Sequence, residues 1–256
     1  MNGRSIKRRF KQLVKLFKVL SNRDYLYALK SGVVAAVEHE SILKNISYAT
    51  VLDVGANKGQ FSLVAKSVRP ECKVIAFEPL ACPASKYRSV FFSNNKLRSD
   101  VILHNVAIGP EYGETDIYVS KRDDSSSLLP ITQMQEEQFP GTGLERVEKI
   151  KVRRLDSCIS ENALKRPVLL KLDVQGYELE ALKGCDSLLD RIDHVLAECS
   201  FVELYEGQAM AHQVITYLQE AGFDLFGVYN ISFDREGMPV QADFFFVQDQ
   251  QRRPTA

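Results

Sequence analysis

The chain has 256 residues, of which 45% are hydrophobic and 26% charged, and its formal net charge at pH 7 is +0. These values are typical of one globular α/β domain with at most a small appendage, and the balanced charge gives no support for a nucleic-acid partner. No apolar stretch approaches the roughly 18–20 residues of a transmembrane helix. Five scattered cysteines without a C-x-x-C pair favour reduced thiols in a cytoplasm over a disulfide framework.

The first predicted unit is a basic helical extension at residues 1–45, ahead of a main domain at 46–250. Residues 1–30 hold nine Lys or Arg and one acid, which leaves 24 basic and 32 acidic residues in the remainder. Apolar residues recur at helical spacing over 6–20, but lysines interrupt them, so the segment lacks the apolar core of a secretory signal. The helix either lies on an anionic surface, such as the inner membrane, or packs on the domain with its charges in water.

Strand and helix patterns alternate from about residue 48. Strands are predicted at residues 50–54, 73–77, 101–106, 168–173, 194–199, 224–229 and 244–247. Helices are predicted at residues 59–68, 82–92, 178–182 and 208–221. The alternation predicts a doubly wound, mostly parallel sheet whose ligands gather at the carboxyl ends of the strands. A long polar insertion at 117–154, flanked by short strands at 115–119 and 148–154, interrupts this rhythm and favours a functional or mobile segment.

The stretch ATVLDVGANKGQFSLVA, at residues 49–65, places a glycine turn between the first strand and helix. It is not a phosphate-binding P-loop, because Lys58 precedes Gly59 and Gln60 follows. It also departs from the dinucleotide pattern, because Asn57 stands where the middle glycine is needed. An acid, Asp53, lies two residues before the first glycine and is a poor neighbour for a pyrophosphate.

S-adenosylmethionine suits these residues better, since it carries an ammonium and a sulfonium but no phosphate. Asp53 can attract its amino group, directly or through water. Gly55 and Gly59 allow the backbone to approach a ligand closely. Glu78 ends the second strand, 25 residues after Asp53, where an acid can accept both ribose hydroxyls. Asn105, at the tip of the third strand, either binds the adenine or caps a turn.

Motifs along the chain resemble those of the FkbM family of methyltransferases. The resemblance runs from about residue 50 to 246 and rests on LDVGANKGQFS, AFEP, VAIG, SSSLL, RRLDS, LLKLDVQGYELEALKG and AECSFVELYEGQ. It implies a Rossmann-like methyltransferase fold and adenosylmethionine-dependent O-methylation of sugars or polyketide-type molecules. The predicted cofactor-binding residues are Asp53, Gly55, Ala56, Asn57, Gly59, Glu78, Pro79, Asn105 and Ala107.

Three carboxylates are candidates for the chemistry. Asp173 follows the fourth long strand, whose tip faces the transferred methyl group, and we expect it to act as base or to orient the acceptor. Glu178 opens the next helix, where it can equally be a favourable charge at a helix N-terminus. Glu198 ends the following strand. Together these carboxylates can also bind Mg²⁺, although no spacing in the sequence demands a metal.

The acceptor is predicted to be a small molecule or carbohydrate, enclosed by a lid at residues 121–147. Ser126 and Ser127, which match the family's serine motif, and Tyr205 are the predicted acceptor-binding residues. Three other readings stay open: a non-catalytic adenosylmethionine-binding module, a nucleoside-cofactor oxidoreductase, and a methyltransferase of nucleic acid or protein. The sequence does not indicate the oligomeric state.

Overall fold

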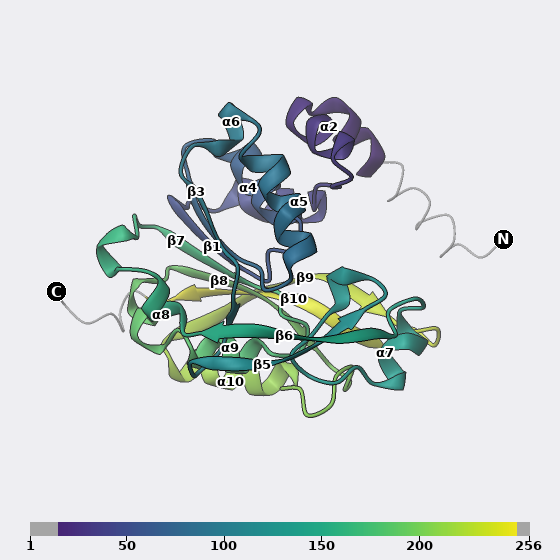
Figure 1. Ribbon diagram of the computed structural model, residues 1–256. Coiled ribbons are helices and arrows are strands. Elements are labelled where there is room, and N and C mark those ends of the chain that lie inside the picture. The colour runs from purple at the N-terminus through teal and green to yellow at the C-terminus, as the bar shows by residue number, and fades with distance from the viewer. Residues whose placement is uncertain (1–14, 250–256) are drawn as a thin grey trace.

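The structure is a computed structural model that describes residues 15–249, leaving aside the side chains of residues 95, 96 and 161. Its centre is a seven-stranded sheet in the order β3-β2-β1-β7-β8-β10-β9 (Figure 1). Only β10 pairs antiparallel, with both of its neighbours. The strands are β1 (Thr50–Val54), β2 (Lys73–Phe77), β3 (Val101–His104), β7 (Val168–Leu172), β8 (His194–Ser200), β9 (Phe223–Phe233) and β10 (Pro239–Gln248).

Helices cover both faces of this sheet (Figure 1). One face is covered by helices from the N-terminal half of the chain. They are the helical residues 15–21, α2 (Arg23–Lys30), η1 (Val37–His39), α3 (Glu40–Asn45), α4 (Gln60–Val68), α5 (Ala81–Phe91) and α6 (Asn95–Arg98). The other side carries α8 (Leu155–Cys158), η3 (Glu161–Ala163), α9 (Glu178–Lys183), η4 (Asp186–Arg191) and α10 (Ala211–Glu220).

Two hydrophobic cores lie on the two faces because side chains alternate along each strand. Val51 and Leu169 belong to the core under α4 and α5, whereas Leu52 and Leu170 belong to the core over α9 and α10. The buried central strands are therefore almost wholly apolar. The polar exceptions in them, Asp53 and Lys171 among them, lie near the carboxyl edge and need a specific explanation.

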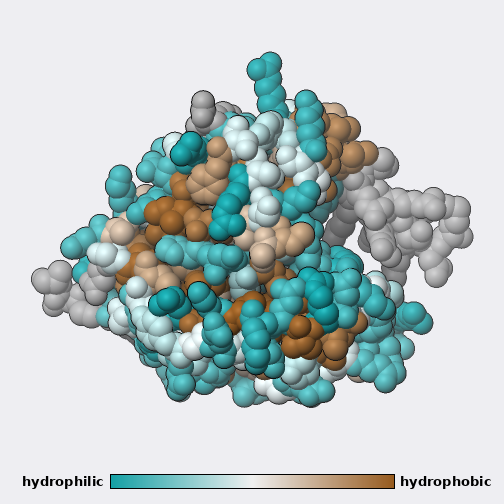
Figure 2. Space-filling model, in the orientation of Figure 1, coloured by the Kyte–Doolittle hydropathy of each residue, from teal (hydrophilic) through white to brown (hydrophobic). Residues whose placement is uncertain are grey.

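A second sheet of three strands, in the order β4-β6-β5, lies beside the carboxyl edge of the large sheet. It consists of β4 (Ala107–Ile108), β5 (Gly113–Ser120) and β6 (Leu144–Arg153), with η2 (Asp123–Ser125) and α7 (Gln133–Gln138) between β5 and β6. Figure 2 shows that hydrophilic side chains cover much of the face over β5 and β6, with apolar groups visible between them. The polar insertion therefore folds into regular secondary structure that forms its own layer.

The prediction of a doubly wound, mostly parallel sheet with a polar insertion is confirmed. The two last strands are much longer than the predicted segments at 224–229 and 244–247. They form a hairpin at the edge of the sheet, where one face and one edge meet water and polar residues are tolerated. For this reason the apolar run alone underestimated β9, which is the edge strand.

The described part of the N-terminal extension packs on the domain and on itself. Val19 is buried in the core, and Lys15 and Lys18 form ion pairs with Glu38 and Glu40. Phe17 remains 74% exposed. Most of the helix predicted at 6–20 lies outside the described residues, so its contact with a membrane surface, like the division of the chain at residue 45, stays a prediction. Between residues 15 and 249, no helix combines the length and apolar composition of a membrane span.

Candidate active site

A cavity of about 540 Å³ opens at the carboxyl ends of β1, β2, β7 and β8, beneath the insertion. Its walls come from the glycine turn, the tips of these strands, the segment around η2 and the N-terminal segment up to His39. Seven acidic side chains line it, against three Lys or Arg. The volume suits a small-molecule ligand, and the excess of carboxylates favours one with a positive charge.

The glycine turn between β1 and α4 depends on two close backbone approaches. Gly55 has φ +79°, and a Cβ there would lie 1.9 Å from the backbone oxygen of Asp173. Asn57 also has positive φ, at 45°, which asparagine tolerates better than most residues. Its backbone N–H donates to Glu78 Oε2 at 2.9 Å. The turn therefore brings the tips of β1, β2 and β7 together.

Glu78 lines the cavity although it is only 4% exposed. Its second oxygen accepts from the backbone N–H of Leu80 at 2.8 Å. Burial raises the pKa of Glu78 to about 7, and the two backbone donors oppose that rise. Each oxygen thus has one fixed partner and a further lone pair for a ligand hydroxyl.

A buried ammonium, Lys171, pairs with the carboxylate of Asp173 and interacts electrostatically with that of Asp53. Lys171 stands opposite Asp53 in the parallel register, and its Nζ donates to Asp173 Oδ2 at 2.7 Å. Burial opposes the charged ammonium, but the charges of Asp173 and Asp53 outweigh it and keep the pKa of Lys171 above its ordinary value. Burial raises the pKa of Asp53, whose Oδ2 accepts from the Ser62 hydroxyl.

Gln175 joins the tips of β7 and β8. Its Nε2 donates to Asp173 Oδ1 at 2.7 Å and to Glu198 Oε2 at 2.9 Å. Burial raises the pKa of Glu198 well above its ordinary value, and the nearby charge of Asp173 adds to the rise. Tyr205 stands behind this pair, with its hydroxyl 2.7 Å from Gln175 Oε1. Asp173 and Glu198 thus face the cavity in fixed orientations.

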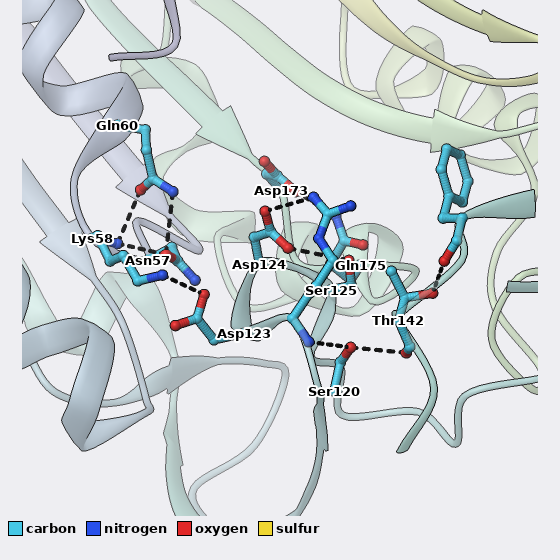
Figure 3. A network of polar contacts seen from close by, with 12 residues as sticks. Asn57, Lys58, Gln60, Ser120, Asp123, Asp124, Ser125, Thr142, Asp173 and Gln175 are labelled. Atoms are coloured by element: carbon cyan, nitrogen blue, oxygen red, sulfur yellow. Dashed lines mark hydrogen bonds and ion pairs between the residues drawn. The ribbon is translucent and has the colours of Figure 1, made fainter. Parts of the chain in front are cut away.

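The insertion is fastened to both ends of the cavity. Lys58 of the glycine turn donates to Asp123 Oδ1 at 2.8 Å, as Figure 3 shows. Ser127 Oγ donates to the backbone oxygen of Gln175 at 2.6 Å, and Ser126 Oγ accepts from the backbone N–H of Ser120. Both serines line the cavity, but these contacts make them braces of the insertion as well.

Most of the predicted site residues lie together in the cavity wall. Those lining it are Gly55, Ala56, Asn57, Glu78, Pro79, Ala107, Ser126, Ser127, Asp173 and Glu198. Asp53 and Gly59 do not line the cavity, and Asp53 is fully buried, so the structure does not show its predicted direct contact with a ligand's amino group. Asp53 has the buried cation Lys171 beside it, and a Cβ on Gly59 would meet the ring of Phe91 at 2.5 Å. Gly59 therefore serves helix packing at the turn.

Three further predicted contacts differ from the structure. Asn105 is exposed, and its amide donates to the backbone oxygens of Glu78 and Pro79, so it supports the second strand tip from outside the cavity. Glu178 is buried and accepts from the backbone N–H groups of Val174 and Gly176, which makes it a cap of the turn before α9. Neither residue lines the cavity.

Tyr205 is the third difference. It is 2% exposed and lies behind the wall, where its hydroxyl reaches Gln175 Oε1 and the backbone oxygen of Ser125. The prediction that it lines the acceptor pocket is therefore wrong for this structure. It holds in place two residues that do line the pocket.

Several cavity residues were not predicted. Lys171 could have been predicted from the sequence. It is a lysine within an apolar strand, and residues two apart in a strand point to the same face, so it shares the face of Asp173. Gln175 stood in a quoted motif without being singled out. His39 and Asp243, whose side chains meet at 3.0 Å, lie 204 residues apart, and no local pattern connects them. Within residues 15–249, no group of three His, Cys, Asp or Glu side chains could hold a metal ion.

Comparison with known proteins identifies the family. The model of the methyltransferase FkbM domain matches residues 53–225. The 2-O-methyltransferase NoeI of Sinorhizobium fredii is 27% identical over 174 residues, which cover 66% of this chain and 70% of NoeI. The 31-O-demethyl-FK506 methyltransferase FkbM of Streptomyces tacrolimicus is 29% identical over 186 residues, or 63% of this chain and 69% of that protein.

The fold agrees with these matches. The crystal structure of methyltransferase FkbM from Methylobacillus flagellatus superposes with a TM-score of 0.50 at 15% identity, covering 77% of this chain. This chain spans 43% of that larger one. Since the family match includes the glycine turn, Glu78, Asp173 and Glu198 and extends over more than half of the sequence, the chain belongs to the FkbM family of methyltransferases.

Proposed function

We propose that the protein is an S-adenosylmethionine-dependent O-methyltransferase that acts on a hydroxyl group of a sugar, polysaccharide or polyketide-type acceptor. The observation that carries this proposal is a single cavity with Glu78 at one end and the bridged pair Asp173 and Glu198 at the other. The names of two relatives, a 2-O-methyltransferase and a 31-O-demethyl-FK506 methyltransferase, support oxygen as the methylated atom.

The residues present fit adenosylmethionine. Gly55 leaves open the space that a Cβ would fill between β1 and β7, and Glu78 offers carboxylate lone pairs to two ribose hydroxyls. The acidic lining complements a ligand with a net positive charge. When bound, adenosylmethionine supplies a methyl group on a positively charged sulfur. Asn57, at the position where the dinucleotide pattern needs its middle glycine, disfavours a dinucleotide cofactor.

The residues at the other end prepare the acceptor. Asp173 is held by Lys171 and Gln175, so its carboxylate can orient a hydroxyl without first reorganising. Glu198, with a pKa raised by burial, is suited to take up the hydroxyl proton, directly or through Asp173. Gln175 couples the two carboxylates, and Ser127 and Tyr205 hold Gln175 in place. Positioning of the acceptor oxygen supplies much of the rate enhancement.

The alternatives make different demands on the cavity. A polyanionic acceptor such as nucleic acid would meet seven carboxylates in the lining. A binding module without catalysis has no need for the bridged carboxylates opposite Glu78. These features favour an enzyme with a small, non-anionic acceptor, and a protein acceptor is left as an outcome of experiment.

Calorimetry and methyl transfer test the proposed function. Titration with adenosylmethionine and, separately, with NAD is expected to give saturable binding of the first only. Incubation with methyl-labelled adenosylmethionine and hydroxyl-bearing acceptors is expected to label the acceptor. Binding of NAD in place of adenosylmethionine would refute the proposal, and cofactor binding with label found only in protein or nucleic acid would refute its acceptor class.

Cofactor affinity is expected to depend on pH through Glu78. Burial gives this carboxyl a pKa of about 7, so the ionised form that accepts ribose hydroxyls is lost as pH falls through that value. Affinity for adenosylmethionine should therefore fall severalfold between pH 8 and pH 6 and then level off at the lower affinity of the protonated form. Calorimetry across that range measures it.

Glu78→Gln should bind the cofactor about tenfold more weakly at pH 8, because one hydrogen bond to a charged acceptor is lost. It should also remove most of the pH dependence, which separates Glu78 from the titration of the ligand itself. Glu220→Gln, an exposed change on α10, is the control and should behave as the unmodified protein. An identical pH slope in Glu78→Gln and the control would contradict this role.

A further inference from the structure

Beyond the two carboxylates assigned to the chemistry, the same wall of the cavity continues onto the β9–β10 hairpin. Asp243 on β10 stands directly opposite Glu198 on β8, and both line the cavity. Asp173, one residue past the end of β7, is level with Glu198 in the parallel register. Neighbouring strands are about 4.8 Å apart, so the backbones at Asp173 and Asp243 are separated by about 10 Å across the sheet.

Asp243 is held so that one oxygen stays available. His39 Nε2 lies 3.0 Å from its Oδ2, and Asn230 Nδ2 donates to the same oxygen at 2.6 Å. Within the described part of the chain, no donor contacts Oδ1. Burial raises the pKa of Asp243, but the contacts with His39 and Asn230 outweigh burial and keep it below its ordinary value. Asp243 is therefore an ionised acceptor at the cavity wall.

Two amides beside it present oxygen as well. A carboxylate can only accept, so Asn230 must turn its nitrogen to Asp243, and Gln241 turns its nitrogen to Glu198 Oε1 at 2.9 Å. Their amide oxygens are then directed elsewhere, and no described residue donates to them. Since both side chains line the cavity, this end of it offers three oxygen acceptors to a ligand.

The cations in the lining do not offset this pattern. Lys15, Arg122, Lys171 and, when protonated, His39 are each paired with a carboxylate, at 2.9, 3.1, 2.7 and 3.0 Å. An anionic ligand group would thus displace an existing ion pair and meet unpaired oxygen atoms. A hydroxyl group, in contrast, can donate to these oxygens without a charge penalty.

We propose that Asp243, Asn230 and Gln241, with His39 as a positioning residue, form an acceptor subsite that binds a second hydroxyl group of an uncharged polyhydroxyl substrate. The inference rests on the proposed function, because Asp173 marks the hydroxyl that is methylated. The subsite lies two strands, or about 10 Å, farther along the sheet. It binds neutral rings and discriminates against acceptors that carry a carboxylate or phosphate at that position.

The position of these residues in the sequence supports a role in acceptor recognition. His39 precedes the family match at 53–225, and Asn230, Gln241 and Asp243 follow it. The residues that fit the cofactor lie inside the match. The subsite is thus contributed by parts of the chain that the family model leaves out, as expected of a feature that distinguishes one acceptor from another.

A matched pair of ligands tests the proposal. Methyl α-glucopyranoside and the methyl glycoside of glucuronic acid share a ring and differ by one carboxylate. Each is titrated by saturation-transfer NMR into the protein loaded with S-adenosylhomocysteine. The neutral glycoside is expected to bind at least about tenfold more tightly than the uronate, a difference of about 1.4 kcal/mol.

Asp243→Asn is the diagnostic variant. The new amide keeps its oxygen toward His39 and Asn230 and turns its nitrogen to the cavity, so one acceptor becomes a donor while the internal contacts persist. The affinity of this variant for the neutral glycoside should fall about tenfold, and its preference for that glycoside over the uronate should shrink. Its affinity for S-adenosylhomocysteine, measured by calorimetry, should be unchanged. Glu236→Gln, an equal charge change in the exposed hairpin turn, should match the unmodified protein.

Three results would overturn the subsite: equal affinity for both glycosides, equal behaviour of Asp243→Asn and Glu236→Gln, or no binding of either glycoside to protein that does bind S-adenosylhomocysteine. Failure of the unmodified protein to bind S-adenosylhomocysteine would instead count against the proposed function itself. Calorimetry with that ligand therefore precedes every glycoside titration.

Discussion

Asp173→Asn is expected to abolish most methyl transfer while leaving cofactor affinity within about threefold. The amide can satisfy either Lys171 or Gln175, but not both, because each of them donates to a different oxygen of the present carboxylate. The acceptor hydroxyl then loses an oriented, charged partner. Loss of one group in a proton-transfer network lowers turnover by roughly 10²–10³-fold. Transfer of labelled methyl, measured beside calorimetry with adenosylmethionine, separates the two effects.

The control for this change is Asp116→Asn, which removes a carboxylate from a surface ion pair with Lys149. Such pairs contribute at most about 1 kcal/mol, so activity and stability should barely change. If Asp173→Asn turned over its acceptor as fast as Asp116→Asn, Asp173 would have no part in the mechanism. Equal loss of cofactor binding and turnover would place Asp173 in the cofactor site instead.

Gly55→Ala is expected to remove cofactor binding and to destabilise the fold. The added Cβ would lie 1.9 Å from the backbone oxygen of Asp173, so the tips of β1 and β7 must separate. This displaces the glycine turn and Asp173 together. Positive φ adds about 1–2 kcal/mol of strain, and the collision brings the expected loss in the free energy of unfolding to about 3 kcal/mol or more. Denaturant unfolding and calorimetry measure the two losses.

Gly32→Ala separates strain from collision. Gly32 has φ +76°, close to the +79° of Gly55, but a Cβ there meets nothing within 4 Å. It should therefore lose only the strain energy of about 1–2 kcal/mol and keep full cofactor affinity. Equal destabilisation of the two variants, with cofactor binding retained in both, would show that the contact between β1 and β7 is looser than the structure has it.

The central fold could be predicted because its signals are local. Apolar runs such as those of β1, β2 and β7 have the length and composition of buried parallel strands, and the glycine turn marks the junction with α4. The hairpin of β9 and β10 was underestimated because polar residues such as Asn230 and Asp243 interrupt its apolar pattern. Those residues are polar because they line a cavity, which only the tertiary structure reveals.

Site residues at the ends of strands were predicted from the sequence. Site residues such as His39 and Asp243, which distant segments bring together, were not. Parallel strands end at one edge of a sheet, so Glu78, Asp173 and Glu198 were expected to gather there. Glu178 and Tyr205 lie close to that edge in sequence, but one caps a turn and the other stands behind Gln175. The direction of a side chain at a strand tip depends on turn geometry, and sequence spacing does not fix it.

The contact between His39 and Asp243 spans 204 residues, and it joins η1, before the first strand, to β10, the last strand. During synthesis the ribosome releases the glycine turn and its neighbouring strands long before Asp243 emerges. Nascent chains generally begin to fold from the N-terminal side. We therefore expect the glycine turn and its neighbouring strands to fold first, whereas the imidazole of His39 has no carboxylate partner until Asp243 has been synthesised. Under the proposed assignment, a chain stopped before β10 would contain the residues expected to bind the cofactor but would lack Asp243 and Gln241 of the acceptor subsite.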